Sequence, residues 1–83
     1  MTFSAEIKVM PLKELLDPQG KAILSGLHHL GITEITDIRV GKNMLLQLNT
    51  SSKEEAYELA NEAAKKLLAN QVMEEFTIDI FST

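Results

Sequence analysis

Both ends of the chain alternate apolar and polar side chains every second residue, a pattern typical of β-strands with one buried face. The first alternating segment covers residues 3–10 and ends at Pro11, and the last covers residues 76–80. A chain of 83 residues has room for one domain, so we expect residues 1–83 to form a single domain with both strands in one sheet.

Two segments between these strands have the period of amphipathic helices. Asp17-Pro18 is a helix-start signal, because Asp caps free backbone N–H groups and Pro is pre-set for the first helical position. Gly31 is typical of a helix end, so the first helix is predicted at about residues 18–30. A capping box at residues 52–55 predicts the start of the second helix. The apolar stripes are Ile23, Leu27 and Leu30 in the first helix, and Ala56, Leu59, Ala60, Ala63 and Leu67 in the second.

Two further strands are predicted at residues 35–40 and 44–49, joined by a tight turn at residues 41–43. The predicted order is therefore strand, helix, strand, strand, helix, strand. The simplest closure is an α+β fold, a ferredoxin-like βαββαβ sandwich whose antiparallel sheet carries both helices on one face.

The composition argues against several classes of function. The chain has no cysteine, which excludes disulfides, thiol catalysis and thiolate metal sites. Its net charge of −4 argues against nucleic acid or an anionic membrane as a partner. The N-terminus does not resemble a signal peptide, and the apolar runs are too short to span a bilayer, so we expect a cytoplasmic protein.

The polar side chains offer no recognisable catalytic constellation. His28 and His29 point about 100° apart as helix neighbours and cannot jointly chelate a metal, so they are interpreted as surface histidines. No serine stands in a nucleophile elbow, and no Gly-rich phosphate loop is present. We therefore predict no catalytic, cofactor-binding or metal site. The remaining cluster is interpreted as the solvated face of the second helix and consists of Glu54, Glu55, Glu58 and Glu62.

Two segments are not fully explained by folding. In residues 16–22, Gly20 falls in the first helical turn, where Gly costs about 1 kcal/mol relative to Ala. That cost is tolerable if something packs against the backbone there, and an ordinary cap is an equal alternative. In residues 38–42, Arg39 and Lys42 place two cations at the rim of the predicted hairpin, where turn chemistry with solubility is again an equal alternative.

These two segments resemble the signatures of the PurS family, the small subunit of phosphoribosylformylglycinamidine (FGAM) synthase. The matching runs are Leu-Asp-Pro-Gln-Gly-Lys-Ala at 16–22 and Ile-Arg-Val-Gly-Lys at 38–42. The resemblance continues through residues 67–76 and covers essentially the whole chain in the expected order. Departures fall in loops, at residues 11–15, where the Pro is displaced, and at Gln71, where the family favours Pro.

The resemblance implies a subunit of a glutamine- and ATP-dependent C–N ligase of de novo purine biosynthesis, which converts formylglycinamide ribonucleotide to FGAM. A glutaminase subunit releases ammonia, and a large synthetase subunit, with ATP and Mg, performs the ligation. The small subunit has no active site and binds no cofactor; as a homodimer or tetramer it bridges the other two so that ammonia passes between them. Subunit contacts are predicted at Asp17, Gln19, Gly20, Lys21, Arg39, Gly41 and Lys42.

Self-association is also expected from the residues. A domain of this size has modest stability alone. Met10, Leu45 and Phe81 lie out of phase with the core-facing positions of their strands, and burying them between protomers would contribute about 25 cal/mol per Å².

An ACT-like domain that binds a small regulatory molecule is the alternative, because it uses the same element order. Such domains usually have a Gly in the loop after the first strand, and residues 11–16 contain none.

Overall fold

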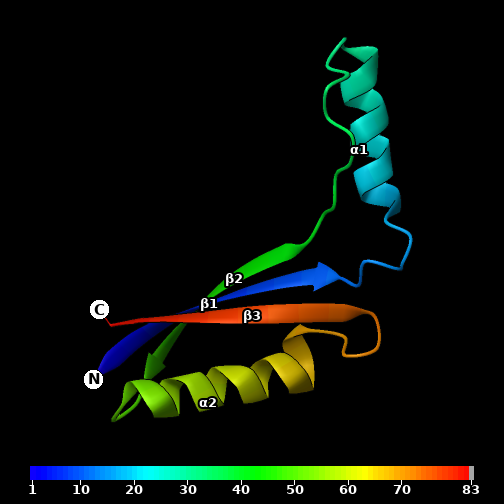
Figure 1. Cartoon of the computed structure of the whole chain (residues 1–83). Coiled ribbons are helices and arrows are strands. Elements are labelled where there is room, and N and C mark those ends of the chain that lie inside the picture. Colours follow the sequence, from blue (N-terminus) through cyan, green and yellow to red (C-terminus); the bar gives the residue numbers. More distant parts are fainter. Residues whose placement is uncertain (83) are drawn as a thin grey trace.

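The computed structural model describes residues 1–82, which form a three-stranded antiparallel sheet and two α-helices (Figure 1). The sheet order is β2-β1-β3, so the N-terminal strand lies in the middle. The elements in chain order are β1 (Thr2–Pro11), α1 (Pro18–His29), β2 (Lys42–Asn49), α2 (Lys53–Ala63), the π-helical turn η1 (Ala64–Leu68) and β3 (Glu74–Ser82).

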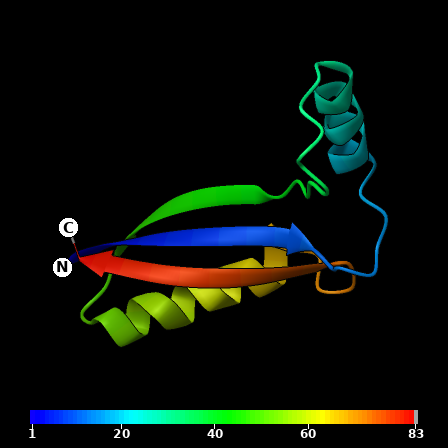
Figure 2. The same ribbon diagram turned by 45° about the horizontal axis from the view of Figure 1, so that its top comes forward.

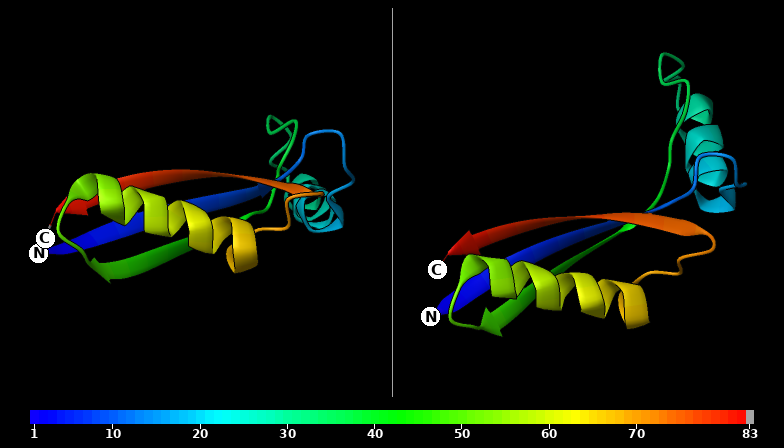
Figure 3. Two further views of the ribbon diagram at one scale, coloured as in Figure 1. Left: turned by 90° about the horizontal axis from the view of Figure 1, so that it is seen from below. Right: turned by 60° about the horizontal axis from the view of Figure 1, so that its bottom comes forward.

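The core lies between one face of the sheet and α2. The apolar positions of β1 point to this face, and Ile7 at its centre pairs with Met44 of β2 and Ile78 of β3. Helix α2 lies along the same face (Figure 3). It contributes Ala56, Ala60 and the following Ala64, all fully buried, and these small side chains let the helix approach the sheet closely. Of the predicted second stripe, Ala56 and Ala60 are buried and Ala63 is half-buried, whereas Leu59 and Leu67 are exposed.

Helix α1 does not lie on the sheet. It projects from one end together with the chain that returns to β2, and we call residues 12–41 the arm (Figures 1 and 2). The radius of gyration is 16.4 Å, whereas a compact domain of this length has about 12 Å. The apolar stripe of α1 is open to solvent in the protomer, with Ile23 49% and Leu30 78% exposed.

The α+β class, the antiparallel sheet and both predicted helices are confirmed. Two details are wrong for this protomer: residues 35–40 form no strand, and α1 does not share a sheet face with α2. The turn predicted at residues 41–43 is also wrong, because Lys42 and Asn43 already belong to β2 and pair with β1.

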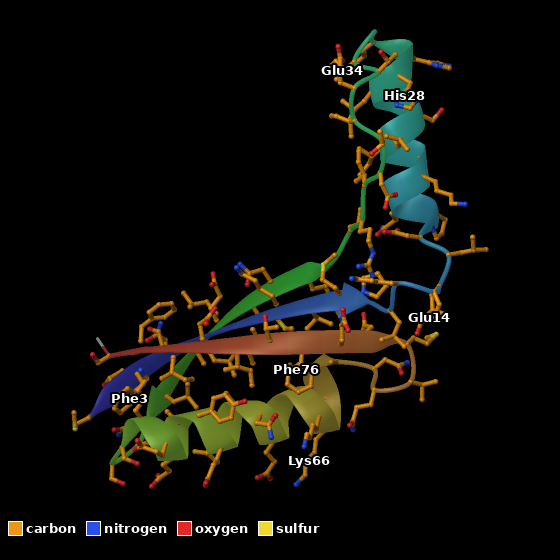
Figure 4. The ribbon with its side chains drawn as sticks, in the orientation of Figure 1. Phe3, Glu14, His28, Glu34, Lys66 and Phe76 are labelled. Carbon is orange, nitrogen blue, oxygen red and sulfur yellow. The ribbon has the colours of Figure 1, made fainter. Side chains whose placement is uncertain are left out.

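Residues 35–40 form no strand because side chains of the arm make hydrogen bonds to backbone groups that a strand would pair. The Val40 N–H donates to the Asp17 carboxylate. Near the tip of the arm, the His28 ring lies 2.9 Å from the carbonyl oxygen of Ile35 (Figure 4). Both histidines are exposed, as predicted. No helix within residues 1–82 has the length and apolar character needed to cross a membrane.

Candidate functional site

The two segments singled out in the sequence meet where the arm leaves the sheet. We call this junction the arm base: Pro11, residues 17–21, residues 38–42 and Glu74. Asp17 is its centre, because its two carboxylate oxygens serve different segments. One accepts the Gly20 N–H at 3.0 Å, and the other accepts the Val40 N–H at 2.7 Å. The carboxylate therefore closes the arm into a loop.

The local sequence explains how Asp17 comes to do this. It is the N-cap of α1, Pro18 occupies the first helical position, and the bond to Gly20 is an ordinary capping bond. The hydrogen bond from Gly20, then that from Val40, and the nearby Arg39 charge hold the pKa of the Asp17 carboxyl below its ordinary value, against a smaller opposing effect of desolvation.

This lowered pKa predicts a pH dependence. A carboxyl whose folded-state pKa is depressed stabilises the fold above its ordinary value of 3.8, and the contribution is lost as the pH falls through the lowered value. In Asp17→Asn the amide nitrogen replaces one acceptor oxygen. We expect this variant to unfold at lower urea concentration than wild type near pH 7, with the difference shrinking below about pH 4.

The control is Asp37→Asn, the same chemical change within the arm. Within residues 1–82 the Asp37 carboxylate accepts only the N–H of its neighbour Ile38, so this variant leaves the arm base closed. A difference between wild type and Asp17→Asn that stays constant from pH 7 to pH 3 would contradict the assigned role of the carboxylate.

Two glycines permit close approach of backbone at the arm base. A Cβ atom at Gly20 would overlap the carbonyl oxygen of Ile38, and one at Gly41 would overlap the Met10 sulfur and the Val9 carbonyl oxygen. Gly20 is the one buried residue of the arm. Both alternatives left open at Gly20 are found, because its N–H makes an ordinary capping bond to Asp17 and the returning segment of the arm packs against its backbone.

The two cations join the arm base to the sheet. The Arg39 guanidinium donates to the carbonyl oxygen of Pro11 at the end of β1. The Lys42 ammonium lies 3.7 Å from the Glu74 carboxylate and donates to the carbonyl oxygen of Leu68 at 3.3 Å. Both cations therefore have partners within this chain, and the Lys42 side chain remains 56% exposed.

Gln19 and Lys21 are the most available of the predicted contact residues. Both are exposed, and neither side chain makes a hydrogen bond or ion pair within the described part of the chain. A hollow of about 330 Å³ lies beside Gln19, lined also by Leu16 and Lys42 among others. That these residues contact another subunit stays a prediction.

Glu74 is the residue of the arm base that the sequence did not reveal. It stands at the start of β3 and pairs with a lysine that is distant in sequence, so no local pattern marks it. The Leu12 N–H also donates to the Met73 carbonyl oxygen at 2.9 Å, which joins the start of the arm to the segment just before β3.

The contacts of the arm base hold the arm in a fixed position relative to the sheet, and its described side chains form no arrangement suited to a reaction. Its carboxylates, Asp17 and Glu74, and two of its three cations, Arg39 and Lys42, are engaged in backbone or ion-pair contacts. Within residues 1–82, no group of three or more His, Cys, Asp or Glu side chains is placed to hold a metal ion.

Comparison with known proteins gives a consistent result. The family model described as PurS, phosphoribosylformylglycinamidine (FGAM) synthase, matches residues 4–82. The FGAM synthase subunit PurS of Mycobacterium leprae is 45% identical over 74 residues, covering 89% of this chain and 90% of the relative.

Solved structures agree with the sequence comparisons. The PurS subunit of Thermotoga maritima aligns with a TM-score of 0.91 at 30% identity, covering 98% of this chain and 93% of that one. A chain of the T. maritima structure described as PurLQS aligns with the same TM-score and identity, covering 98% and 99%. The likeness therefore includes the projecting arm as well as the sheet, and the chain belongs to the PurS family of FGAM synthase subunits.

Proposed function

We propose that the chain is the non-catalytic small subunit of FGAM synthase in de novo purine biosynthesis, acting in the cytoplasm. In this proposal it self-associates and bridges a glutaminase subunit and a large synthetase subunit, so that ammonia released by the first reaches the second. ATP and Mg belong to the synthetase subunit. The observation that carries the proposal is the arm, a projection with an uncovered apolar stripe, in a protein whose relative occurs in a structure described as PurLQS.

Self-association follows from what the protomer leaves open. Helix α2 lies mainly over β3 and β1. Met44, Leu46 and Leu48 of β2 remain half-buried, as do the core-facing apolar side chains of β3. The large side chains buried within residues 1–82 are Phe3, Ile7 and Val9 alone. Such a small core makes burial between chains energetically valuable.

The bare side of the sheet and the arm are complementary surfaces. In a ferredoxin-like sandwich a second helix would cover the sheet face at β2, and a fourth strand would lie beside β2, which is the side left bare here. The arm carries a helix with an apolar stripe followed by an extended segment. We infer that the arm of a second copy covers the β2 side, and that the exchange is reciprocal.

Reconstituted synthesis tests the bridging role. We expect glutamine-dependent FGAM formation by the two larger subunits to require this chain, because released ammonia must be delivered between them. Synthesis from added ammonium salt should be much less dependent on it. The chain alone should turn over neither glutamine nor ATP.

The double change Arg39→Ala, Lys42→Ala should weaken the complex with the two larger subunits, as measured by size-exclusion chromatography. The effect should be larger at low salt than at high salt, because salt screens charge contacts. Thermal melting is the control, since Arg39 also bonds Pro11. An unchanged complex with unchanged glutamine-dependent synthesis would contradict a docking role for these cations. A collapsed melting temperature would show instead that they support the fold.

A further inference from the structure

A groove of about 680 Å³ runs between the first turns of α2 and strand β3. It lies along the outer side of β3, at the opposite edge of the sheet from β2. The helix contributes Lys53, Glu54, Tyr57 and Glu58, and the strand contributes residues 78–81.

The groove presents aromatic surface to solvent. Tyr57 is 48% exposed and Phe81 is 52% exposed, while Ile78 and Ile80 between them are half-buried. Half-exposed aromatic side chains beside aliphatic ones are typical of protein–protein contacts, because they bury large area at low entropic cost.

The charge of the groove is one-sided. Three carboxylates, Glu54, Glu58 and Asp79, lie against a single cation, Lys53. Within residues 1–82 none of these three carboxylates forms an ion pair, whereas Glu6, Glu62 and Glu74 each have a lysine within 4.0 Å. Their charge is therefore available to a partner.

The position of the groove separates it from the proposed contact between copies. The start of α2 lies beside the end of β3, near both termini, and the arm projects from the other end of the sheet (Figures 1 and 3). The molecule is 51 Å long. A second copy on the β2 side would leave this groove open.

We propose that the groove is the docking site for a basic amphipathic segment of one of the two larger FGAM synthase subunits; this rests on the proposed function. Apolar side chains of that segment pack on Tyr57 and Phe81, and its Lys or Arg side chains pair with the three carboxylates. The groove suits such a partner better than a further copy of this chain, which has 12 acidic and 8 basic residues.

The test compares two double variants of the full chain. Glu54→Gln, Glu58→Gln removes two charges from the groove. Glu55→Gln, Glu62→Gln removes two charges from the same helix outside it, and each pair includes one residue of the first turn. Binding to each larger subunit is measured separately by titration calorimetry at low and high salt.

We expect the groove variant to bind one of the larger subunits about tenfold more weakly at low salt, with a smaller loss at high salt, and the control variant to stay within about twofold of wild type. Tyr57→Ala should weaken the binding of the same subunit at both salt concentrations, because the contact of Tyr57 is apolar.

Three outcomes would overturn the inference or its basis. Equal binding by both double variants rejects the groove as a docking site. A changed oligomer mass for the groove variant, with unchanged binding of the larger subunits, shows that a second copy occupies it. If wild type binds neither larger subunit, the proposed function itself fails, and the groove variant then has nothing to weaken.

Discussion

Gly20→Ala should lower the free energy of unfolding by about 1–3 kcal/mol, the usual cost of forcing extra volume into a packed site. The added Cβ would overlap the carbonyl oxygen of Ile38 and lie 2.8 Å from the Asp17 carboxylate. Neither atom can move freely, because the carbonyl belongs to the backbone and the carboxylate bonds two N–H groups. Urea unfolding monitored by circular dichroism measures the change.

The same helix supplies the control. A Cβ at Gly26 has no neighbour within 4 Å, so Gly26→Ala should raise the free energy of unfolding by about 0.5–1 kcal/mol through helix propensity alone. Gly41→Ala should behave like Gly20→Ala, because its Cβ would overlap Val9 and Met10. If Gly20→Ala and Gly26→Ala both stabilised the protein, the close packing assigned to the arm base would be wrong.

The helices could be predicted from the sequence because their signals are local. Asp17-Pro18 and the capping signal at residues 52–55 act within one turn, and both N-caps occur in the structure, where Ser52 accepts the Glu55 N–H. Within the described chain, the Glu55 carboxylate accepts the Ser51 hydroxyl and does not complete the capping box. Strand β1 was equally clear, since its alternation matches one fully buried face.

Residues 35–40 show where local reasoning fails. Their composition favours a strand, but a strand needs a partner, and no sequence pattern specifies one. In the protomer the Val40 N–H goes to a carboxylate far away in sequence. The same limitation applies to Glu74, whose lysine partner lies on β2.

The apolar stripe of α1 shows a different limit. The stripe was read as core, and Ile23 and Leu30 are largely exposed in the protomer. Periodicity indicates that a helix face is to be covered, but not whether the cover comes from the same chain or another. Leu45 and Phe81, expected to lie outside the core, are exposed at 66% and 52%.

The seven residues predicted as subunit contacts lie together at the junction of arm and sheet. That they contact another subunit stays a prediction. The sequence could not show that Asp17, Gly20, Arg39 and Gly41 fix the direction of the arm, because each acts through a backbone group of a distant segment. The residues of the arm base can both contact another subunit and fix the arm, since a rigid base presents the arm to a partner in one orientation.

The double change Ile23→Glu, Leu30→Glu should convert the proposed oligomer to single chains. If these side chains are covered by a second copy, each buried carboxylate costs on the order of 2 kcal/mol or more. Because a reciprocal exchange buries both changes from each of the two copies, the four carboxylates together raise the dissociation constant by roughly a millionfold. Light scattering at micromolar concentration should then give a mass near 9.2 kDa, the mass of one chain.

The matched control is Ser25→Glu, His29→Glu, which puts two glutamates on the opposite face of the same helix. Both of these side chains are exposed, and we expect the mass of this variant to equal that of wild type. Loss of the oligomer should also lower the melting temperature, because the protomer core left behind buries few large side chains, Phe3, Ile7 and Val9 within residues 1–82. A single-chain mass for wild type, or an unchanged mass for Ile23→Glu, Leu30→Glu, would show that the arm's apolar stripe serves some purpose other than self-association, and the larger subunits would then be the next partners to test on it.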